Sequence, residues 1–84
     1  MKYCLITFRS VTPAQRGERV LNRAGVRCTL SRTPKWMEQQ GCGYSLRVTV
    51  AEAPEAARLL REERVDFRKI YLLHENGRGE ELQL

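Results

Sequence analysis

The chain has 84 residues, a net charge of +5 and 42% hydrophobic residues. This length suits one domain near the small end of what folds unaided, so we treat residues 1–84 as a single domain. No apolar run approaches the roughly 20 residues that a membrane-spanning helix needs. The opening MKYCLITF is typical of a strand rather than of a signal peptide. We therefore expect a cytoplasmic protein that does not associate with a membrane.

Three cysteines and one histidine restrict the chemistry that the sequence allows. An odd number of thiols, Cys4, Cys28 and Cys42, argues against a disulfide framework. The chain has no CxxC pair and a lone His74, so we expect neither a metal nor a cofactor. Acidic residues are interspersed with the basic ones. This mixture indicates a solvated surface rather than a nucleic-acid stripe, and nucleic-acid binding is not expected.

The first half of the chain predicts two strands separated by a helix. Residues 2–8 alternate, with Cys4 on the same face as Ile6 and Phe8. The segment Thr12-Pro13-Ala14-Gln15 is typical of a helix start, with Thr12 as the cap, and helical spacing continues over 13–24. Residues 26–31 alternate again and predict the second strand.

The second half predicts another strand, a helix and a last strand. Residues 44–50 alternate, and Pro54 opens a helix with acidic residues near its start. Residues 69–74 predict the fourth strand. Asn76-Gly77 is a turn signal, so residues 75–84 form either a frayed tail or a short extra hairpin beyond a core of about 2–74.

The order β-α-β-β-α-β favours an α+β, ferredoxin-like sandwich. Its antiparallel sheet has the strand order 4-1-3-2, and both helices cover one face. In that topology the first strand ends, and the third begins, at the edge where the first helix starts. We therefore expect Cys42 to lie beside Ser10 and Thr12.

Cys42 stands between Gly41 and Gly43, which remove side-chain bulk and permit unusual backbone angles. The free amides and the dipole of the helix start favour a thiolate there. Cations expected at the same edge would add to this effect; they are Arg9, Arg32, Lys35 and Arg68. In the alternative reading Cys42 is a small hydrophobe and the glycines only form a turn. Cys4 and Cys28 have the parity of core residues.

Around these residues the sequence resembles a family of small bacterial domains, the selenium/sulfur-carrier-like proteins, and the likeness covers residues 2–74. The segments that carry it are Phe8-Arg9-Ser10, Thr33-Pro34-Lys35, Cys42-Gly43 and Leu46-Arg47. The resemblance implies a carrier whose Cys42 thiol accepts a persulfide or selenopersulfide from a donor protein and passes it to an acceptor. Ser10 and Thr12 would shape the pocket. Side chains that would stabilise anionic sulfur or dock an acidic partner are Arg9, Arg32, Lys35 and Arg47, although the parity of Arg47 places it on the open sheet face.

A second hypothesis is a non-catalytic ferredoxin-like module that binds RNA, a small ligand or a protein partner. The open sheet face would carry an apolar patch, which we interpret as a homodimer interface; its residues are Tyr3, Leu5, Tyr71 and Leu73. Trp36 either forms a lid or docking anchor near Cys42 or covers the end of the sheet. A conventional enzyme lacks support, because no Ser/His/Asp or Cys/His grouping can be assembled.

Overall fold

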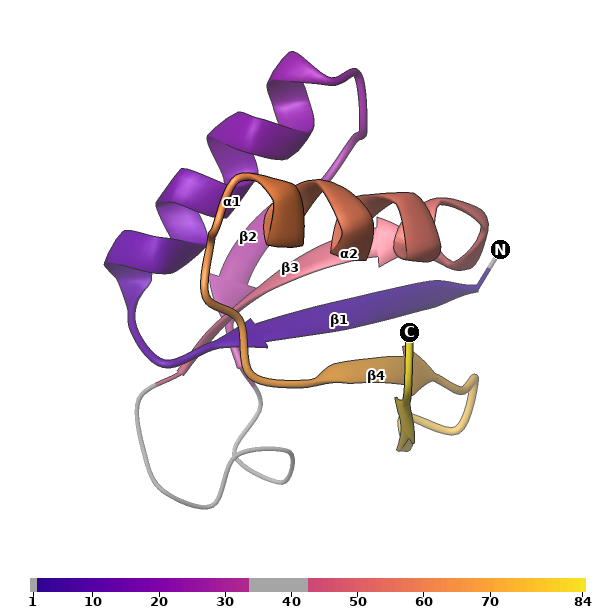
Figure 1. Cartoon of the computed structure of the whole chain (residues 1–84). Coiled ribbons are helices and arrows are strands. Elements are labelled where there is room, and N and C mark those ends of the chain that lie inside the picture. Colours follow the sequence, from indigo (N-terminus) through magenta and orange to yellow (C-terminus); the bar gives the residue numbers. More distant parts are fainter. Residues whose placement is uncertain (1, 34–42) are drawn as a thin grey trace.

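The structure, a computed structural model, describes residues 2–33 and 43–84 (Figure 1). Its elements in chain order are β1 (Tyr3–Phe8), α1 (Val11–Arg23), β2 (Thr29–Arg32), β3 (Tyr44–Thr49), a 3₁₀ turn η1 (Val50–Glu52), α2 (Ala53–Glu62), β4 (Ile70–Leu73) and β5 (Gly79–Leu82). The fold is α+β, with two helices on one face of a five-stranded antiparallel sheet. Over the described ranges, neither helix has the length and apolar character needed to span a bilayer.

The strands lie in the order β2-β3-β1-β4-β5. The four-stranded sheet predicted from the sequence was therefore incomplete, because the chain after β4 adds a fifth strand. Gly77 adopts a left-handed conformation (φ +85°) in the turn, and the His74 amide bonds to the Arg78 carbonyl at 2.8 Å. Leu82 then pairs with Ile70 and packs against the core. This apolar contact holds the hairpin on the sheet.

The core lies between the sheet and the two helices. Alternate residues of the central strands face the helices and are buried; they are Cys4, Ile6, Phe8, Leu46, Val48 and Ile70. The helices contribute Ala14, Leu21, Ala53, Ala56, Ala57 and Leu60. Cys4 has no exposed surface, as its parity predicted, and burial raises the pKa of its thiol.

Helix α1 begins two residues earlier than the sequence predicted. Its N-cap is Ser10, in an extended conformation, and the predicted cap Thr12 is an exposed residue of the first turn. Pro13 is tolerated there because the first amides of a helix have no acceptor within it. The Ser10 side chain makes no capping hydrogen bond, and the first turn contains no acidic residue. The positive end of the helix dipole is therefore not offset by a carboxylate of that turn.

Strand β2 begins three residues later than predicted. The amide of Val26, which the alternation assigned to the strand, bonds instead to the Leu21 carbonyl of α1 at 2.8 Å. The chain cannot join the sheet until this turn is complete, so pairing starts with Thr29 opposite Arg47. The later part of β3 consequently has no partner on its β2 side.

Both helices end in the same hydrogen-bonded turn, with different residues in the left-handed position. This position is Gly25 after α1 (φ +83°) and Arg64 after α2 (φ +57°). In each turn the next residue, Val26 or Val65, donates its amide at 2.8 Å to the carbonyl five residues earlier. Glycine is the usual residue in this turn, and a side chain there strains the backbone.

We expect Arg64→Gly to raise the free energy of unfolding by about 0.5–1 kcal/mol. The left-handed penalty of about 1–2 kcal/mol disappears, less the extra chain entropy that glycine has in the unfolded state. Urea denaturation measures the change. Gly25→Ala, the matched control at the equivalent position, should lower stability by a similar amount. An Arg64→Gly protein no more stable than the wild type would contradict the strain assigned to this position.

Candidate functional site

Several segments meet where β1 ends, at the left of the sheet in Figure 1. Tyr44, the first residue of β3, lies between Phe8 at the end of β1 and Arg32 at the end of β2. One residue further out, the Thr33 amide donates to the Gly43 carbonyl at 2.9 Å. Helix α1 starts beside this end of the sheet, after a two-residue link from β1. We call this end of the sheet, together with the adjoining start of α1, the Gly43 edge. Its residues at the sheet are Phe8, Arg32, Thr33, Gly43 and Tyr44.

Several of the predicted site residues are placed at the Gly43 edge. Arg9 and Ser10 directly follow β1 and are exposed, and Thr12 is exposed in the first turn of α1. Arg32 is exposed at the end of β2, with its guanidinium 5.9 Å from the centroid of the Tyr44 ring. The chain topology thus gathers two arginines and two hydroxyl-bearing residues at this edge.

Four of the predicted site residues lie outside the described residues: Lys35, Trp36, Gly41 and Cys42. Their predicted roles therefore stay predictions. The chain neighbour of Cys42 is described. Gly43 is buried, and its carbonyl takes part in the β2–β3 pairing.

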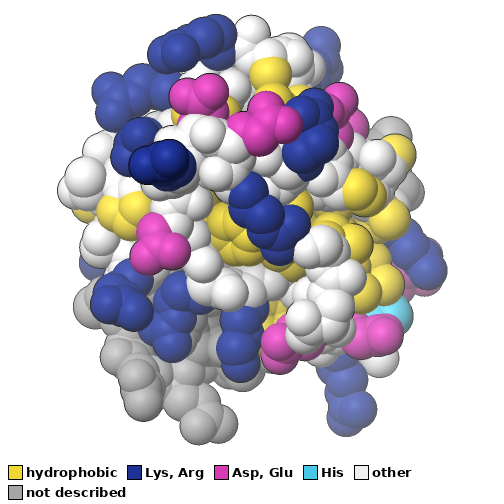
Figure 2. Space-filling view, in the orientation of Figure 1, with side chains coloured by type: hydrophobic (Ala, Val, Ile, Leu, Met, Phe, Trp, Pro, Cys, Tyr) yellow, Lys and Arg dark blue, Asp and Glu magenta, His cyan; other side chains and the backbone are white. Residues whose placement is uncertain are grey.

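A further cation reaches this end of the sheet through the link between α2 and β4. The amide of Arg68 donates to the Thr7 carbonyl at 2.7 Å. The Thr7 hydroxyl accepts a hydrogen bond from the amide of Lys69 at 3.1 Å and donates one to the carbonyl of Lys69 at 3.2 Å. These bonds anchor the link to β1. Figure 2 shows Lys and Arg side chains gathered at the lower left, where β1 ends in the same orientation. These charges and the dipole of α1 make the edge favourable for an anion.

Within residues 2–33 and 43–84, two buried hydroxyls at the Gly43 edge have no hydrogen-bond partner. Ser45 has no exposed surface, and Thr33 is 7% exposed. Ser45 faces away from the helices, opposite Thr7 and Ser31. An unpaired buried hydroxyl costs about 1–3 kcal/mol, so each of these two groups lowers the stability of the fold. Sequence reasoning missed them because the pairing register, which brings them to one edge, is not visible in the sequence.

Arg47 is not brought to the Gly43 edge. It lies on the open face of the sheet, opposite Leu5 on one side and Thr29 on the other. Its guanidinium lies 4.8 Å from the centroid of the Tyr3 ring. It lies four positions along the chain from Gly43, which is about 13–14 Å.

Cys28 is separate from the predicted site. It is half-buried beside a cavity of about 650 Å³ at the far end of β3, and its thiol contacts Asn22 Oδ1 at 3.8 Å. Burial, and then the charge of Glu18, raise the pKa of Cys28 to about 11. Near neutral pH its thiol is therefore protonated and a poor nucleophile, as is that of the buried Cys4.

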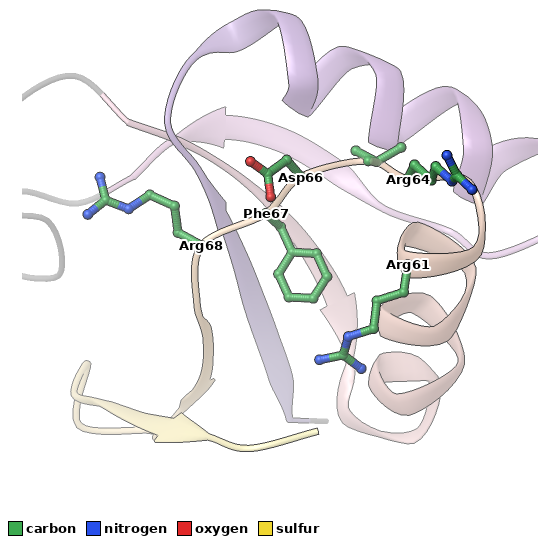
Figure 3. Close-up of a pocket in the computed structure, with 6 residues that line it drawn as sticks. Arg61, Arg64, Asp66, Phe67 and Arg68 are labelled. Carbon is green, nitrogen blue, oxygen red and sulfur yellow. The ribbon is translucent and has the colours of Figure 1, made fainter.

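A second cavity, of about 520 Å³, lies between the end of α2 and the link to β4 (Figure 3). Its three arginines do not converge. The Arg61 guanidinium lies 5.3 Å from the Phe67 ring centroid, and Arg64 and Arg68 point in opposite directions, with Asp66 between them. The cavity therefore offers no single focus for an anion. Among the described residues, no three His, Cys, Asp or Glu side chains are grouped so that they could hold a metal ion.

The fold and the Gly43 edge define a small α+β domain with a cationic end of its sheet. In the sequence, Cys42 directly precedes Gly43. Comparison with protein families identifies the family. Residues 3–72 match the family described as "Putative Se/S carrier protein-like", and the chain belongs to it. The resemblance inferred from the sequence is confirmed. No curated protein and no solved structure matches the chain.

Proposed function

We propose that this protein carries sulfur or selenium on Cys42 between a donor protein and an acceptor protein. Family membership supports a carrier-like role that involves other proteins. The observation that carries the proposal is the position of Gly43, the residue next to Cys42, at the cationic end of the sheet where α1 begins. Cations and helix-start amides lower the pKa of a nearby thiol and so favour the nucleophilic thiolate.

The transfer is a thiol exchange. The Cys42 thiolate attacks the outer sulfur of a donor persulfide, a new S–S bond forms on Cys42, and the S–S bond of the donor breaks. The donor leaves as a thiolate, and the proton that Cys42 lost on ionising goes to solvent. The same step with an acceptor thiolate discharges the carrier. No external oxidant is consumed, and selenium follows the same route as a selenopersulfide.

The other residues of the edge serve binding rather than bond making. Arg9 and Arg32, both exposed, present positive charge to an acidic surface of a partner, which raises the rate of encounter. Lys35 and Trp36 are proposed contacts of the same kind.

Incubation with a cysteine desulfurase and free cysteine, followed by intact-mass measurement, tests the proposal. The wild type should gain one sulfur atom, and Cys42→Ser should gain none. Cys28→Ser is the matched control and should load like the wild type, because the pKa of about 11 keeps the Cys28 thiol protonated. If Cys42→Ser gains sulfur as well as the wild type does, the proposal fails.

Ser45→Ala should separate stability from loading. Removing a buried, unpaired hydroxyl should leave the free energy of unfolding unchanged or raise it by about 1 kcal/mol. Sulfur loading should stay unchanged, because the hydroxyl has no exposed surface from which to reach a bound anion. Ser31→Ala, an exposed serine opposite Ser45, is the control and should change neither quantity. A destabilised Ser45→Ala protein would contradict the absence of a hydrogen-bond partner for this hydroxyl.

A further inference from the structure

The sheet face without helices carries side chains in ordered rows. The pairing register aligns four residues straight across β3, β1, β4 and β5: Arg47, Leu5, Tyr71 and Glu81. Arg47 and Glu81, at the two ends, are exposed, whereas Leu5 and Tyr71 in the middle are buried and half-buried. The row thus has a cation at one end, an anion at the other end and two largely apolar side chains between them.

The neighbouring row follows the same strands. Its members in the same order are Thr49, Tyr3, Leu73 and Gly79. Tyr3 and Leu73 are half-buried and lie next to Leu5 and Tyr71 on the same face. Together these four residues form an apolar centre, bordered by Arg47 on the β3 side and Glu81 on the β5 side.

We infer that a second copy of this chain packs against this face and forms a symmetric dimer. A two-fold axis between the two sheets, parallel to the strands and midway between β1 and β4, exchanges the two halves of each row. It places Arg47 of one copy over Glu81 of the other, and this contact occurs twice. It places Leu5 over Tyr71, so apolar groups meet in the centre and opposite charges meet at the rim.

The shape of the sheet agrees with this axis. The same operation places Tyr3 over Leu73, and Thr49 over Gly79, which has no side chain to obstruct it. A twisted sheet is a saddle surface, and a two-fold axis along its strands maps a saddle onto itself. Two copies therefore stack with their faces parallel, as aligned sheets do in sandwich folds.

Among the residues that the structure describes, the charges at the rim have no strong partners within one chain. Arg47 and Glu81 are three strand spacings apart, about 14 Å, so they cannot pair with each other in a monomer. Arg47 stacks on the Tyr3 ring, and Glu81 lies 3.5 Å from Lys69 with 41% of its side chain exposed. An exposed ion pair such as Lys69–Glu81 contributes about 0.2–1 kcal/mol to stability. Such weak contacts leave Arg47 and Glu81 able to bind across an interface.

The size of the face sets the expected strength of association. Four strands of about six residues or fewer cover roughly 14 by 20 Å, which is below the about 800 Å² per partner of a standard interface. We therefore expect a concentration-dependent dimer with a dissociation constant in the micromolar range rather than an obligate one. The Gly43 edge plays no part in the contact.

Sedimentation of four proteins at several concentrations tests the inference: wild type, Arg47→Glu, Glu81→Arg and the double variant. Each single variant places like charges face to face at both symmetric contacts, so the dissociation constant should rise at least about tenfold. The double variant restores opposite charges and should return to within about threefold of the wild type. Because the two residues are too far apart to pair within one chain, such a rescue can arise only between copies.

Arg19→Glu, an exposed change on α1, is the matched control and should dimerise like the wild type. Circular dichroism confirms that each variant is folded. A wild type that stays monomeric throughout, or folded single variants whose defect the double variant does not restore, would overturn the inference. A monomeric wild type that binds a single-stranded RNA probe through Arg47 would instead assign the face to nucleic acid. The result is independent of Cys42, because Cys42→Ser should dimerise normally whether or not the carrier proposal holds.

Discussion

Phe8→Ala should lower the free energy of unfolding by about 3–5 kcal/mol. Phe8 has no exposed surface and is among the largest fully buried side chains of the described chain. Its ring packs under α1, and its removal leaves a cavity that the surrounding helices and strands fill only in part. Small domains are stable by about 5–15 kcal/mol, so the variant loses a large share of its stability.

Urea denaturation monitored by circular dichroism measures this loss. Phe8→Leu, which retains an apolar side chain, should cost clearly less than Phe8→Ala. Phe8 is the last residue of β1 and pairs with Tyr44, so Phe8→Ala should also loosen the Gly43 edge. A loss of less than about 1 kcal/mol in Phe8→Ala would contradict the close packing assigned to this ring.

Gly17→Val should lower the free energy of unfolding by about 1–3 kcal/mol. A Cβ atom at this position would lie 3.1 Å from Phe8 Cζ and 3.2 Å from terminal carbons of Leu46 and Leu60. These neighbours are fully buried, so none can move aside into solvent. The absence of a side chain at Gly17 lets α1 approach the sheet closely, and this approach sets where α1 begins relative to β3.

A graded series separates close packing from helix propensity. Gly17→Ala gains about 1 kcal/mol of helix propensity but still crowds its neighbours, so its stability should fall between wild type and Gly17→Val. Arg19→Val, an exposed change two residues away, should alter stability by about 0.5 kcal/mol or less. Phe8→Ala should partly rescue Gly17→Val, because the cavity admits the new side chain. Full stability of Gly17→Val would contradict the contact.

The proposed association and the proposed sulfur transfer depend on different parts of the same sheet. The carrier proposal depends on the end of β1 and β3, whereas the proposed dimer depends on the open face between β3 and β5. The charge-reversal variants at Arg47 and Glu81 should therefore leave sulfur loading unchanged. Likewise, Ser45→Ala should leave dimerisation unchanged.

Local sequence patterns determined most of the elements of this protein. Alternation over residues 2–8 and 44–50 predicted β1 and β3, and the helical spacing that ends at Gly25 predicted α1. These features depend on the period of neighbouring residues and on the backbone preferences of glycine and proline, which are properties of the chain itself. The family resemblance was recognisable for the same reason, because its motifs are short continuous segments.

Boundaries and pairing were decided by the tertiary structure. The Val26 amide is taken by the end of α1, which shortens β2, and Leu82 contacts the core, which adds β5 to the sheet. Register likewise brings Ser45 beside the Gly43 edge and aligns Arg47 with Glu81. Such features depend on contacts between residues far apart in the chain, whose free energy is gained only when the elements pack together. No local pattern in the sequence encodes them.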